Sequence, residues 1–326
     1  MNKRYDHSYS SCIAVPIEGL ISERRASGFM YNSAANMLKQ LDTFCINNGF
    51  LCSTVTKELA DAWSVQRDTE GINSRNIRVS ILRQLSKYIL SLGGNAYVPP
   101  DKQSGETKIA HVFSEQEIRD FFTGLEFLSP KGGRYAGMLL TECKVIFRLY
   151  YCCGLRRAEP VELKWINVDL EEGWIKIIQS KGYKDRKLWL SDELLNMLKE
   201  YRKTIVKIFP GSEYVFPGIK NGNHISGGTV REYFLRALSY TTCADIANPP
   251  TIKSFRHTFV VDRLNNWMAA GESIQEKLPY LCKFLGHSSI HESLYYYHQV
   301  EEGRRLIREK DKTSQIVIPE VIPYED

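Results

Sequence analysis

Residues 251–259 read Thr-Ile-Lys-Ser-Phe-Arg-His-Thr-Phe, residues 285–291 read Leu-Gly-His-Ser-Ser-Ile-His, and residues 295–298 read Tyr-Tyr-Tyr-His. Basic and phenolic side chains therefore recur at short intervals among apolar residues that we expect to be buried. Arginine can hold a phosphate group with two parallel hydrogen bonds, and tyrosine can act as a covalent nucleophile. This combination of residue types indicates chemistry on a phosphodiester.

The spacing of these segments resembles the C-terminal half of the signature of the tyrosine recombinase (phage integrase) family. That signature reads His-x-x-Arg-His-Thr-Phe, then Leu-Gly-His, then a tyrosine nine residues after the last histidine, and from His287 this distance selects Tyr296. The resemblance implies that Arg256 is the second catalytic arginine, that His287 donates a hydrogen bond to a phosphate oxygen, and that Tyr296 is the nucleophile. Consecutive residues of a helix point in different directions, so only one tyrosine can face the site, and Tyr295 and Tyr297 are the alternatives.

Lys253 stands where the family most often has histidine, three residues before Arg256. Histidine can accept a proton or donate a hydrogen bond, whereas lysine normally stays cationic and only donates. We therefore expect Lys253 to stabilise a phosphate without acting as a general base. His257 is expected to support Arg256 rather than to contact the phosphate itself.

The N-terminal half of the signature, Gly-Leu-Arg-x-x-Glu, matches residues 154–159, which read Gly-Leu-Arg-Arg-Ala-Glu. In that register Arg156 is the first catalytic arginine and Arg157 is not, and Glu159 would orient the active-site arginines. The strongly apolar residues 137–153 predict a buried central helix that the glycine ends. Taken alone, the hexapeptide could equally hold a surface ion pair of little energetic value.

A β-hairpin is predicted between the two halves of the signature, because β-branched and aromatic residues flank a turn that contains glycine. Strands are expected at residues 166–168, 174–178 and 186–190, with the turn at residues 180–185. The family carries a catalytic lysine at the Lys-Gly-x-Lys step of this hairpin, which implies that Lys181 protonates the leaving oxygen. Lys184 and Lys187 are the alternatives, and contact with the DNA backbone or with solvent is the simpler explanation for both.

Helical periodicity dominates the rest of the chain. We expect an N-terminal helical domain over residues 1–100, a proline-containing linker over residues 101–111, a second domain over residues 112–312 and a C-terminal tail over residues 313–326. The predicted fold class is mainly α with a small antiparallel β-sheet. The resemblance implies an N-terminal core-binding (SAM-like) domain followed by an α+β catalytic domain, with the tail docked on a neighbouring subunit.

Composition sets broad limits on the protein. Of the 326 residues 43% are hydrophobic, and the formal net charge is +5. These values support full-sized cores and a mild basic excess that is consistent with a polyanionic partner. The polar start of the chain, and the lack of an apolar run of about 18 residues, favour a cytoplasmic protein without a membrane span, and the resemblance implies association with the nucleoid.

No metal or other cofactor is expected. The eight cysteines form no Cys-x-x-Cys pair, so reduced thiols are predicted rather than a zinc site. His287 and His291 have the spacing of a zinc-binding pair on a helix, but no glutamate follows the first histidine and no third ligand is evident.

The resemblance implies double-stranded DNA as the partner. The residues predicted to contact it are Arg75, Arg78, Arg83 and Lys87 on a helix over residues 74–92, Lys184 at the hairpin, and Arg231 and Arg236 on a helix over residues 229–240. Contacts from such residues to phosphates give affinity rather than sequence choice. A solvated helix surface is the alternative explanation for the charges on the first of these helices.

The predicted function is site-specific recombination, in which DNA strands are cut and rejoined through a 3′-phosphotyrosyl intermediate. The resemblance implies a tetramer on DNA, with accessory DNA-bending proteins as further partners and a mobile element as the home of such an integrase or transposase. Two alternatives stay open. One is a DNA-binding protein with a degenerate catalytic site, suggested by Lys253, and the other is a type IB-like topoisomerase.

Overall fold

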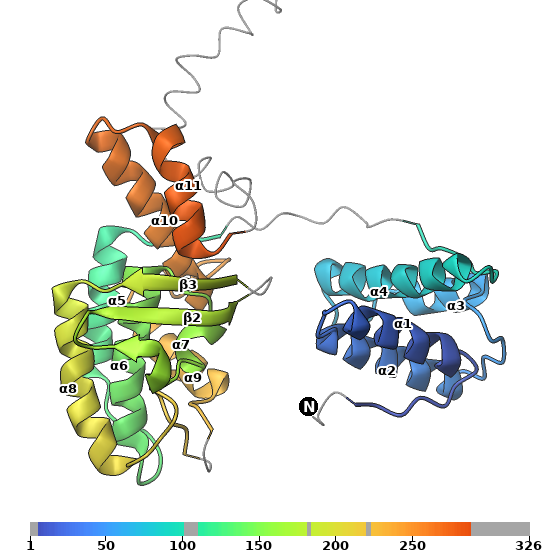
Figure 1. Cartoon of the computed structure of the whole chain (residues 1–326), viewed down its shortest axis with the longest axis horizontal. Coiled ribbons are helices and arrows are strands. Elements are labelled where there is room, and N and C mark those ends of the chain that lie inside the picture. Colours follow the sequence, from blue (N-terminus) through green and yellow to red (C-terminus); the bar gives the residue numbers. More distant parts are fainter. Residues whose placement is uncertain (1–5, 101–109, 181–183, 220–222, 288–326) are drawn as a thin grey trace, which may run out of the picture. The chain divides into compact units, whose positions relative to one another are not determined.

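The computed structural model describes residues 6–100, 110–180, 184–219 and 223–287. The chain divides into two compact units, Met1–Thr107 and Lys108–Asp326, and Figure 1 traces both. Each unit buries an apolar core of its own, which is what allows a domain to fold independently. Within the described residues, no helix has the length and apolar character needed to cross a membrane.

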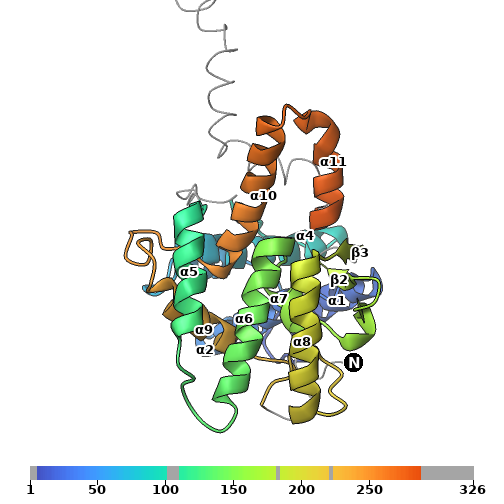
Figure 2. The same ribbon diagram turned by 90° about the vertical axis from the view of Figure 1, so that its left-hand side faces the viewer.

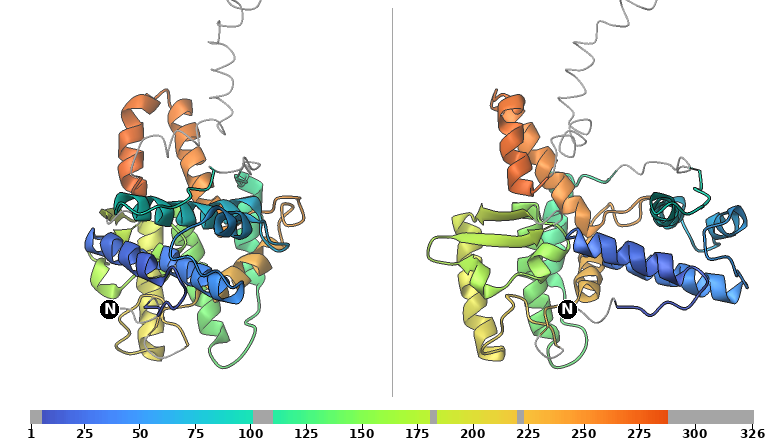
Figure 3. Two further views of the ribbon diagram at one scale, coloured as in Figure 1. Left: turned by 90° about the vertical axis from the view of Figure 1, so that its right-hand side faces the viewer. Right: turned by 45° about the vertical axis from the view of Figure 1, so that its right-hand side comes forward.

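The N-terminal unit is a bundle of helices. They are α1 (Ala14–Ala26), α2 (Asn32–Asn47), α3 (Lys57–Ser64) and α4 (Ile72–Ser91). Figure 3 presents them from two further sides. Leu38, Trp63 and Leu85 lie in their shared core, and Thr56 caps α3 by accepting a hydrogen bond from the backbone N–H of Leu59 at 3.2 Å.

The inward face of α4 differs from the predicted one. Arg78 was expected on the exposed cationic face, but the side chain exposed at this point is that of Ile77, at 59%. Arg78, the next residue, is buried instead, together with Val79 and Leu82. The helix therefore presents a charged residue to the interior, and this residue must find its partners there.

The second unit combines helices with a small sheet. In chain order it has α5 (Glu115–Phe127), α6 (Ala136–Cys153), α7 (Ala158–Val161), a 3-10 turn (Trp165–Asn167), β1 (Val168–Asp169), β2 (Trp174–Ser180), β3 (Lys184–Trp189), α8 (Asp192–Ile208), α9 (Gly227–Leu238), α10 (Ile252–Ala269) and α11 (Ile274–Leu285). The mainly helical fold class with an antiparallel sheet is confirmed. As predicted, α6 is the central buried helix, and it packs against α8, α9 and α10.

The sheet has the order β1-β2-β3 and is antiparallel throughout. Ile177 of β2 lies opposite Arg186 of β3, and Ile175 lies opposite Leu188. The first strand was placed too early by the sequence: Ile166 belongs to the 3-10 turn and is 85% exposed. A short turn of this kind leaves little chain for pairing before the loop to β2, so β1 has only two residues.

The last described helices, α10 and α11, form a pair at one end of the unit (Figure 2). Their apolar side chains form a cluster of their own that includes Val260, Leu264 and Leu281. The N-terminal part of α10 instead joins the main core through Phe255. As a result, α10 connects the central helix to the segment that ends at His287.

Candidate active site

The turn after α6 fixes the position of the first predicted arginine. Gly154 ends the helix with φ of 57°, a left-handed conformation that glycine adopts without strain. A Cβ added at Gly154 would lie 2.7 Å from Cδ1 of Phe259 on α10. The glycine therefore both reverses the chain and lets the segment of Arg156 pack against α10.

Two segments hold the Arg156 guanidinium. Nη1 donates to Oε1 of Glu159 at 3.2 Å, and Nη2 donates to the carbonyl oxygen of Gly286 at 2.6 Å. The backbone N–H of Arg156 also donates to Oε2 of Glu159 at 2.7 Å. Burial alone would raise the pKa of Glu159, but the hydrogen bonds and charges of Arg186 and Arg156 outweigh burial and lower that pKa. Glu159 is therefore an ionised carboxylate that orients Arg156.

Arg256 on α10 lies deeper in the protein and is only 4% exposed. Its Nη1 donates to the carbonyl oxygen of Gly154, and its Nη2 donates to the carbonyl oxygen of Leu285, both at 2.8 Å. These carbonyl groups belong to the C-terminal ends of α6 and α11, where backbone acceptors lack partners within the helix. One guanidinium thus joins the two chain segments that carry Arg156 and His287.

The two neighbours of Arg256 in the predicted site differ in character. Lys253 is exposed on the first turn of α10, whereas His257 is 2% exposed. Burial, followed by the positive charges of Lys253 and Arg256, lowers the pKa of His257 to about 4. His257 is therefore neutral at physiological pH, so the cationic groups here are the lysine and the arginine.

His287 follows α11 directly. Gly286 ends that helix with φ of 66°, and the backbone N–H of His287 donates to the carbonyl oxygen of Cys282 at 2.9 Å. The helix end is thus satisfied by backbone atoms, in the manner of a glycine C-cap. The main chain of His287 thus caps the helix, and its side chain lines the pocket described next.

A pocket of about 900 Å³ brings the predicted residues together. Its lining consists of Leu155, Arg156, Arg157, Arg231, Phe234, Leu235, Pro249, Pro250, Thr251, Ile252, Lys253, Arg256, His257 and His287. In the described part of the chain, the lining includes four arginines and a lysine but no carboxylate. A concave site with this concentration of positive charge is suited to an anion such as a phosphodiester.

The structure also places residues here that were not predicted. Arg157 was assigned no catalytic role, yet it is exposed and lines the pocket. Arg186 of β3 is 7% exposed and binds Glu159 through both terminal nitrogens. A period of two would have revealed Arg186, because it falls on the same face of the strand as the buried Leu188.

The predicted DNA contacts on α9 and β3 have different surroundings. Arg231 is exposed and lines the pocket, whereas Arg236 donates to the carbonyl oxygen of Ser129 at 2.6 Å and is absent from the lining. Lys184 begins β3. Lys187, the other alternative to Lys181, is exposed and lies over the Trp174 and Trp189 rings, with Nζ 4.0 Å and 4.6 Å from their centroids.

Several predicted residues lie outside the described part of the chain. They are Lys181, Tyr296, its alternatives Tyr295 and Tyr297, His291, and the tail at residues 313–326. Their roles therefore remain predictions from the sequence.

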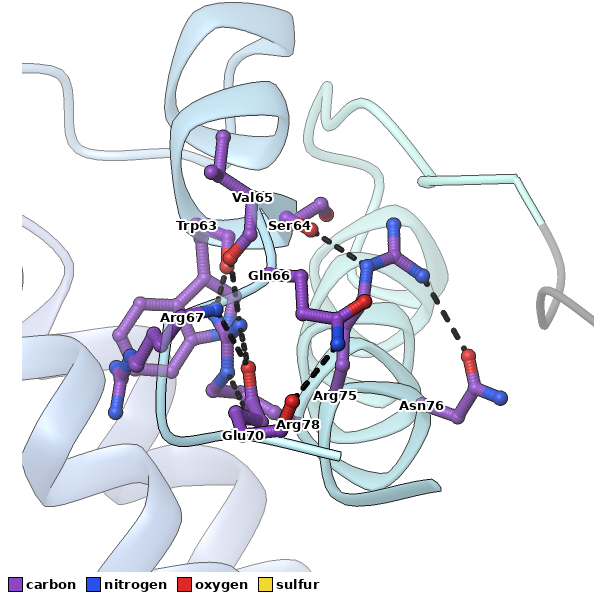
Figure 4. A network of polar contacts seen from close by, with 9 residues as sticks. All are labelled: Trp63, Ser64, Val65, Gln66, Arg67, Glu70, Arg75, Asn76 and Arg78. Atoms are coloured by element: carbon purple, nitrogen blue, oxygen red, sulfur yellow. Dashed lines mark hydrogen bonds and ion pairs between the residues drawn. The ribbon is translucent and has the colours of Figure 1, made fainter. Parts of the chain in front are cut away.

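In the N-terminal unit the expected cationic face of α4 is only partly available. Arg78 is 2% exposed, and its Nε and Nη2 donate to the two carboxylate oxygens of Glu70 at 2.9 and 2.6 Å. It also binds the carbonyl oxygens of Trp63 and Val65 (Figure 4). The prediction that Arg78 contacts DNA is wrong for this fold, because its guanidinium is buried and its donors bind the α3–α4 connection.

The other three basic residues of α4 stay nearer the surface. Arg75 donates to the carbonyl oxygen of Ser64 at 2.7 Å, and Arg83 donates to that of Pro99. Lys87 is exposed. Arg75 and Arg83 thus use some of their hydrogen-bond donors within the unit. DNA contact stays a prediction for all three residues.

One group of side chains within the described residues could hold a metal ion. Potential ligand atoms of His111, Glu117 and Cys243 all lie within 4.8 Å of one another. Hydrogen bonding already uses some of them, since Nε2 of His111 lies 3.1 Å from Oε2 of Glu117. Burial raises the pKa of Cys243 to about 11, which favours the thiol over the thiolate that binds metals. The absence of a metal requirement remains a prediction.

Comparison with known proteins agrees with this geometry. A sequence model of the phage integrase family matches residues 134–302, a range that contains the whole pocket lining. A similar protein is y4qK of Sinorhizobium fredii, an inferred integrase/recombinase, which is 25% identical over 297 residues that cover 89% of this chain and 86% of that protein.

Solved structures with a similar fold include two integrases. One is the Tn1549 transposon integrase in complex with transposon right end DNA, with a TM-score of 0.63 and 17% identity, covering 90% of this chain and 98% of that one. The other is a lambda integrase tetramer bound to a Holliday junction, with a TM-score of 0.59 and 17% identity, covering 86% of this chain and 76% of that one. At this level of identity the likeness concerns the fold.

Proposed function

Since the chain belongs to the phage integrase family of tyrosine recombinases, and so breaks and rejoins DNA at specific sites, we propose that the pocket between Arg156 and Arg256 binds the scissile phosphodiester. One observation carries the proposal. Segments far apart in the sequence bring Arg156, Lys253, Arg256 and His287 to a single pocket whose described lining has no carboxylate. A phosphate in that pocket would meet only positive or neutral donors.

The chemistry follows from the positions of these donors. Arg156 and Arg256 bind the non-bridging oxygens and neutralise the charge that grows in the pentavalent transition state. Lys253 and His287 add further donors. Preorganised cations can stabilise the transferring phosphoryl group in this way in place of metal ions.

Tyr296 is proposed as the nucleophile. Its hydroxyl oxygen forms a bond to phosphorus as the bond from phosphorus to the 5′-oxygen breaks, and the phenol proton is lost to water. Lys181 protonates the leaving 5′-oxygen. The products are a 3′-phosphotyrosyl bond and a free 5′-hydroxyl group, and attack by a 5′-hydroxyl of another strand reverses the step. Because the protein–DNA bond conserves the phosphodiester, no energy-supplying cofactor is needed.

The replacement of histidine by Lys253 fits this chemistry. An exposed lysine on the first turn of α10 still supplies a cation to the pocket. His257 is neutral, because its pKa is lowered to about 4, and it is buried beside Arg256. We therefore assign Lys253 to phosphate binding, and we do not favour a degenerate DNA-binding protein or a relaxing topoisomerase.

The proposed partner is double-stranded DNA, bound by a tetramer in which the tail at residues 313–326 docks on a neighbouring subunit. The similar lambda integrase is a tetramer on a Holliday junction, and the similar Tn1549 protein is a transposon integrase on transposon DNA. These relatives support an integrase of a mobile element. Accessory DNA-bending proteins are a further proposed partner.

Covalent capture of DNA tests the proposal. A pool of nicked duplexes with randomised sequence is incubated with the protein, and DNA that stays attached after denaturation is sequenced to define a suicide substrate. We expect Tyr296→Phe to abolish the adduct, whereas Tyr295→Phe and Tyr297→Phe retain it. An adduct that persists in Tyr296→Phe and disappears in Tyr297→Phe would move the nucleophile by one residue, and no adduct with any duplex would refute the proposed chemistry.

A further inference from the structure

Arg186 is a buried cation whose place in the site no sequence motif assigned. Its side chain comes from β3, opposite Ile177 in the sheet, and is 7% exposed. Nη1 donates to Oε1 of Glu159 at 2.9 Å, and Nη2 donates to Oε2 at 2.6 Å. This two-pronged pairing of guanidinium with carboxylate is the strong form of a charged hydrogen bond.

Glu159 has a second cationic partner. Arg156 approaches Oε1 of the same carboxylate through Nη1 at 3.2 Å, a longer contact than either one from Arg186. Both guanidinium groups lie against the same point of the α11 end, since a Cβ added at Gly286 would be 3.2 Å from Nη1 of Arg186 and 3.4 Å from Nη1 of Arg156. The two arginines therefore share one carboxylate, and one of them, Arg156, lines the pocket.

We propose that Arg186 is a positioning residue for strand cleavage, which acts by neutralising Glu159 so that Arg156 can direct its charge to the phosphate. The inference rests on the proposed function. Arg156, Glu159 and Arg186 together carry a formal charge of +1. With Arg186 present, the carboxylate is already paired, and Glu159 orients Arg156 through the side-chain contact at 3.2 Å and the backbone N–H.

Without the charge of Arg186, the negative charge of Glu159 would fall to Arg156, with which the carboxylate also forms an ion pair. A partly buried carboxylate attracts the nearest cation strongly, because little water screens the pair. Arg156 would then be drawn toward Glu159, and its charge would neutralise that carboxylate instead of stabilising the phosphate of the substrate. Arg186 itself need not touch the DNA for this effect.

The test replaces Arg186 by methionine, which has a similar length and no charge. Cleavage is followed in single turnover at saturating DNA, with the captured suicide substrate. We expect the rate constant of Arg186→Met to fall about tenfold or more while its Kd for DNA stays within about fivefold of wild type. Arg119→Met is the matched control, because it removes an arginine from an exposed ion pair with Glu115 on α5, and it should cleave within about twofold of wild type.

Two further variants separate positioning from a general loss of structure. In Arg186→Met with Glu159→Gln, no carboxylate is left to attract Arg156, so cleavage should be at least about threefold faster than in Arg186→Met. Arg186→Lys keeps the positive charge without the planar guanidinium, and its cleavage rate constant should lie between those of wild type and Arg186→Met. If Arg186→Met does not fold, Arg186→Lys is compared with wild type in its place. A double variant no faster than Arg186→Met, or Arg186 variants with the wild-type rate, would overturn the inference.

DNA affinity gives a readout that does not depend on the cleavage chemistry. Arg156→Met should weaken binding of the captured duplex, or of a random-sequence duplex at low salt, and it should do so less in the Arg186→Met background than in wild type. Equal losses in the two backgrounds would refute the role of Arg186 even in a protein that forms no adduct. Failure of every variant and of wild type to form the adduct, with unequal losses of affinity, would instead refute the proposed function alone.

Discussion

Replacement of Arg256 by lysine would separate charge from geometry at the centre of the pocket. Arg256 is 4% exposed and donates through two nitrogens to the carbonyl oxygens of Gly154 and Leu285, each at 2.8 Å. Lysine keeps the positive charge but offers a compact ammonium in place of a planar fork. We expect the ammonium to reach at most one of the two carbonyl groups.

The expected loss has a structural and a chemical part. A buried carbonyl without a donor costs roughly 1 to 3 kcal/mol of unfolding free energy, which in a domain of this size lowers the Tm by roughly 2 to 12 °C. The missing donor on the phosphate should slow cleavage by about 10² to 10³. The two effects share a cause, since the same guanidinium that holds the ends of α6 and α11 also lines the pocket.

The assay combines thermal unfolding, followed by far-UV circular dichroism, with single-turnover cleavage of the captured suicide substrate. Arg231→Lys is the control, because Arg231 also lines the pocket but is exposed, and its Tm should match wild type within about 2 °C. If Arg256→Lys keeps the wild-type Tm and cleaves within about threefold of wild type, the two carbonyl contacts do not organise the site and the reasoning fails.

Two further predictions concern the core and the tail. Burial raises the pKa of Glu142 on α6 to about 9 despite a hydrogen bond from Tyr201. A carboxyl group whose pKa is higher in the folded than in the unfolded protein stabilises the fold fully below its pKa in the unfolded protein. This stabilisation is lost as the pH rises toward 9. Glu142→Gln should therefore flatten the decline in Tm between about pH 5 and 9 and raise the free energy of unfolding at neutral pH by up to about 3 kcal/mol. An unchanged slope of Tm against pH would contradict a protonated Glu142. Deletion of residues 313–326 should reduce tetramer formation on DNA, measured by light scattering, and leave binding by single subunits intact; an undiminished tetramer would contradict docking of the tail.

Much of the secondary structure followed from short-range signals. Ser114 and Glu117 form the predicted capping box of α5, and Ser191 caps α8 by accepting a hydrogen bond from the backbone N–H of Leu194. Gly154 ends α6 in the left-handed conformation that its position suggested. Each of these signals involves residues within one helical turn, so no knowledge of tertiary packing was needed.

The errors arose where a charge is buried by residues far away in the sequence. On α4, Arg78 was expected at the surface, but it is buried because it binds Glu70 and the carbonyl oxygens of Trp63 and Val65. Arg186 was overlooked for the same reason. The alternation along β3 marks Arg186 as inward-facing, but its partner Glu159 is 27 residues away, so no local pattern could identify that partner.

The sequence by itself determined the family and predicts Arg156, Arg256, His287 and Tyr296 as the site residues, because their chemistry requires specific residue types at fixed intervals along the chain. Only the tertiary structure decided how the described residues are arranged: that Arg256 joins the ends of α6 and α11, that Lys253 and His257 differ in charge at neutral pH, and that Arg186 shares Glu159 with Arg156. The physical reason is that burying a charge is costly unless partners surround it. Those partners come from several elements, so only the assembled fold specifies which charges are buried and which face the substrate.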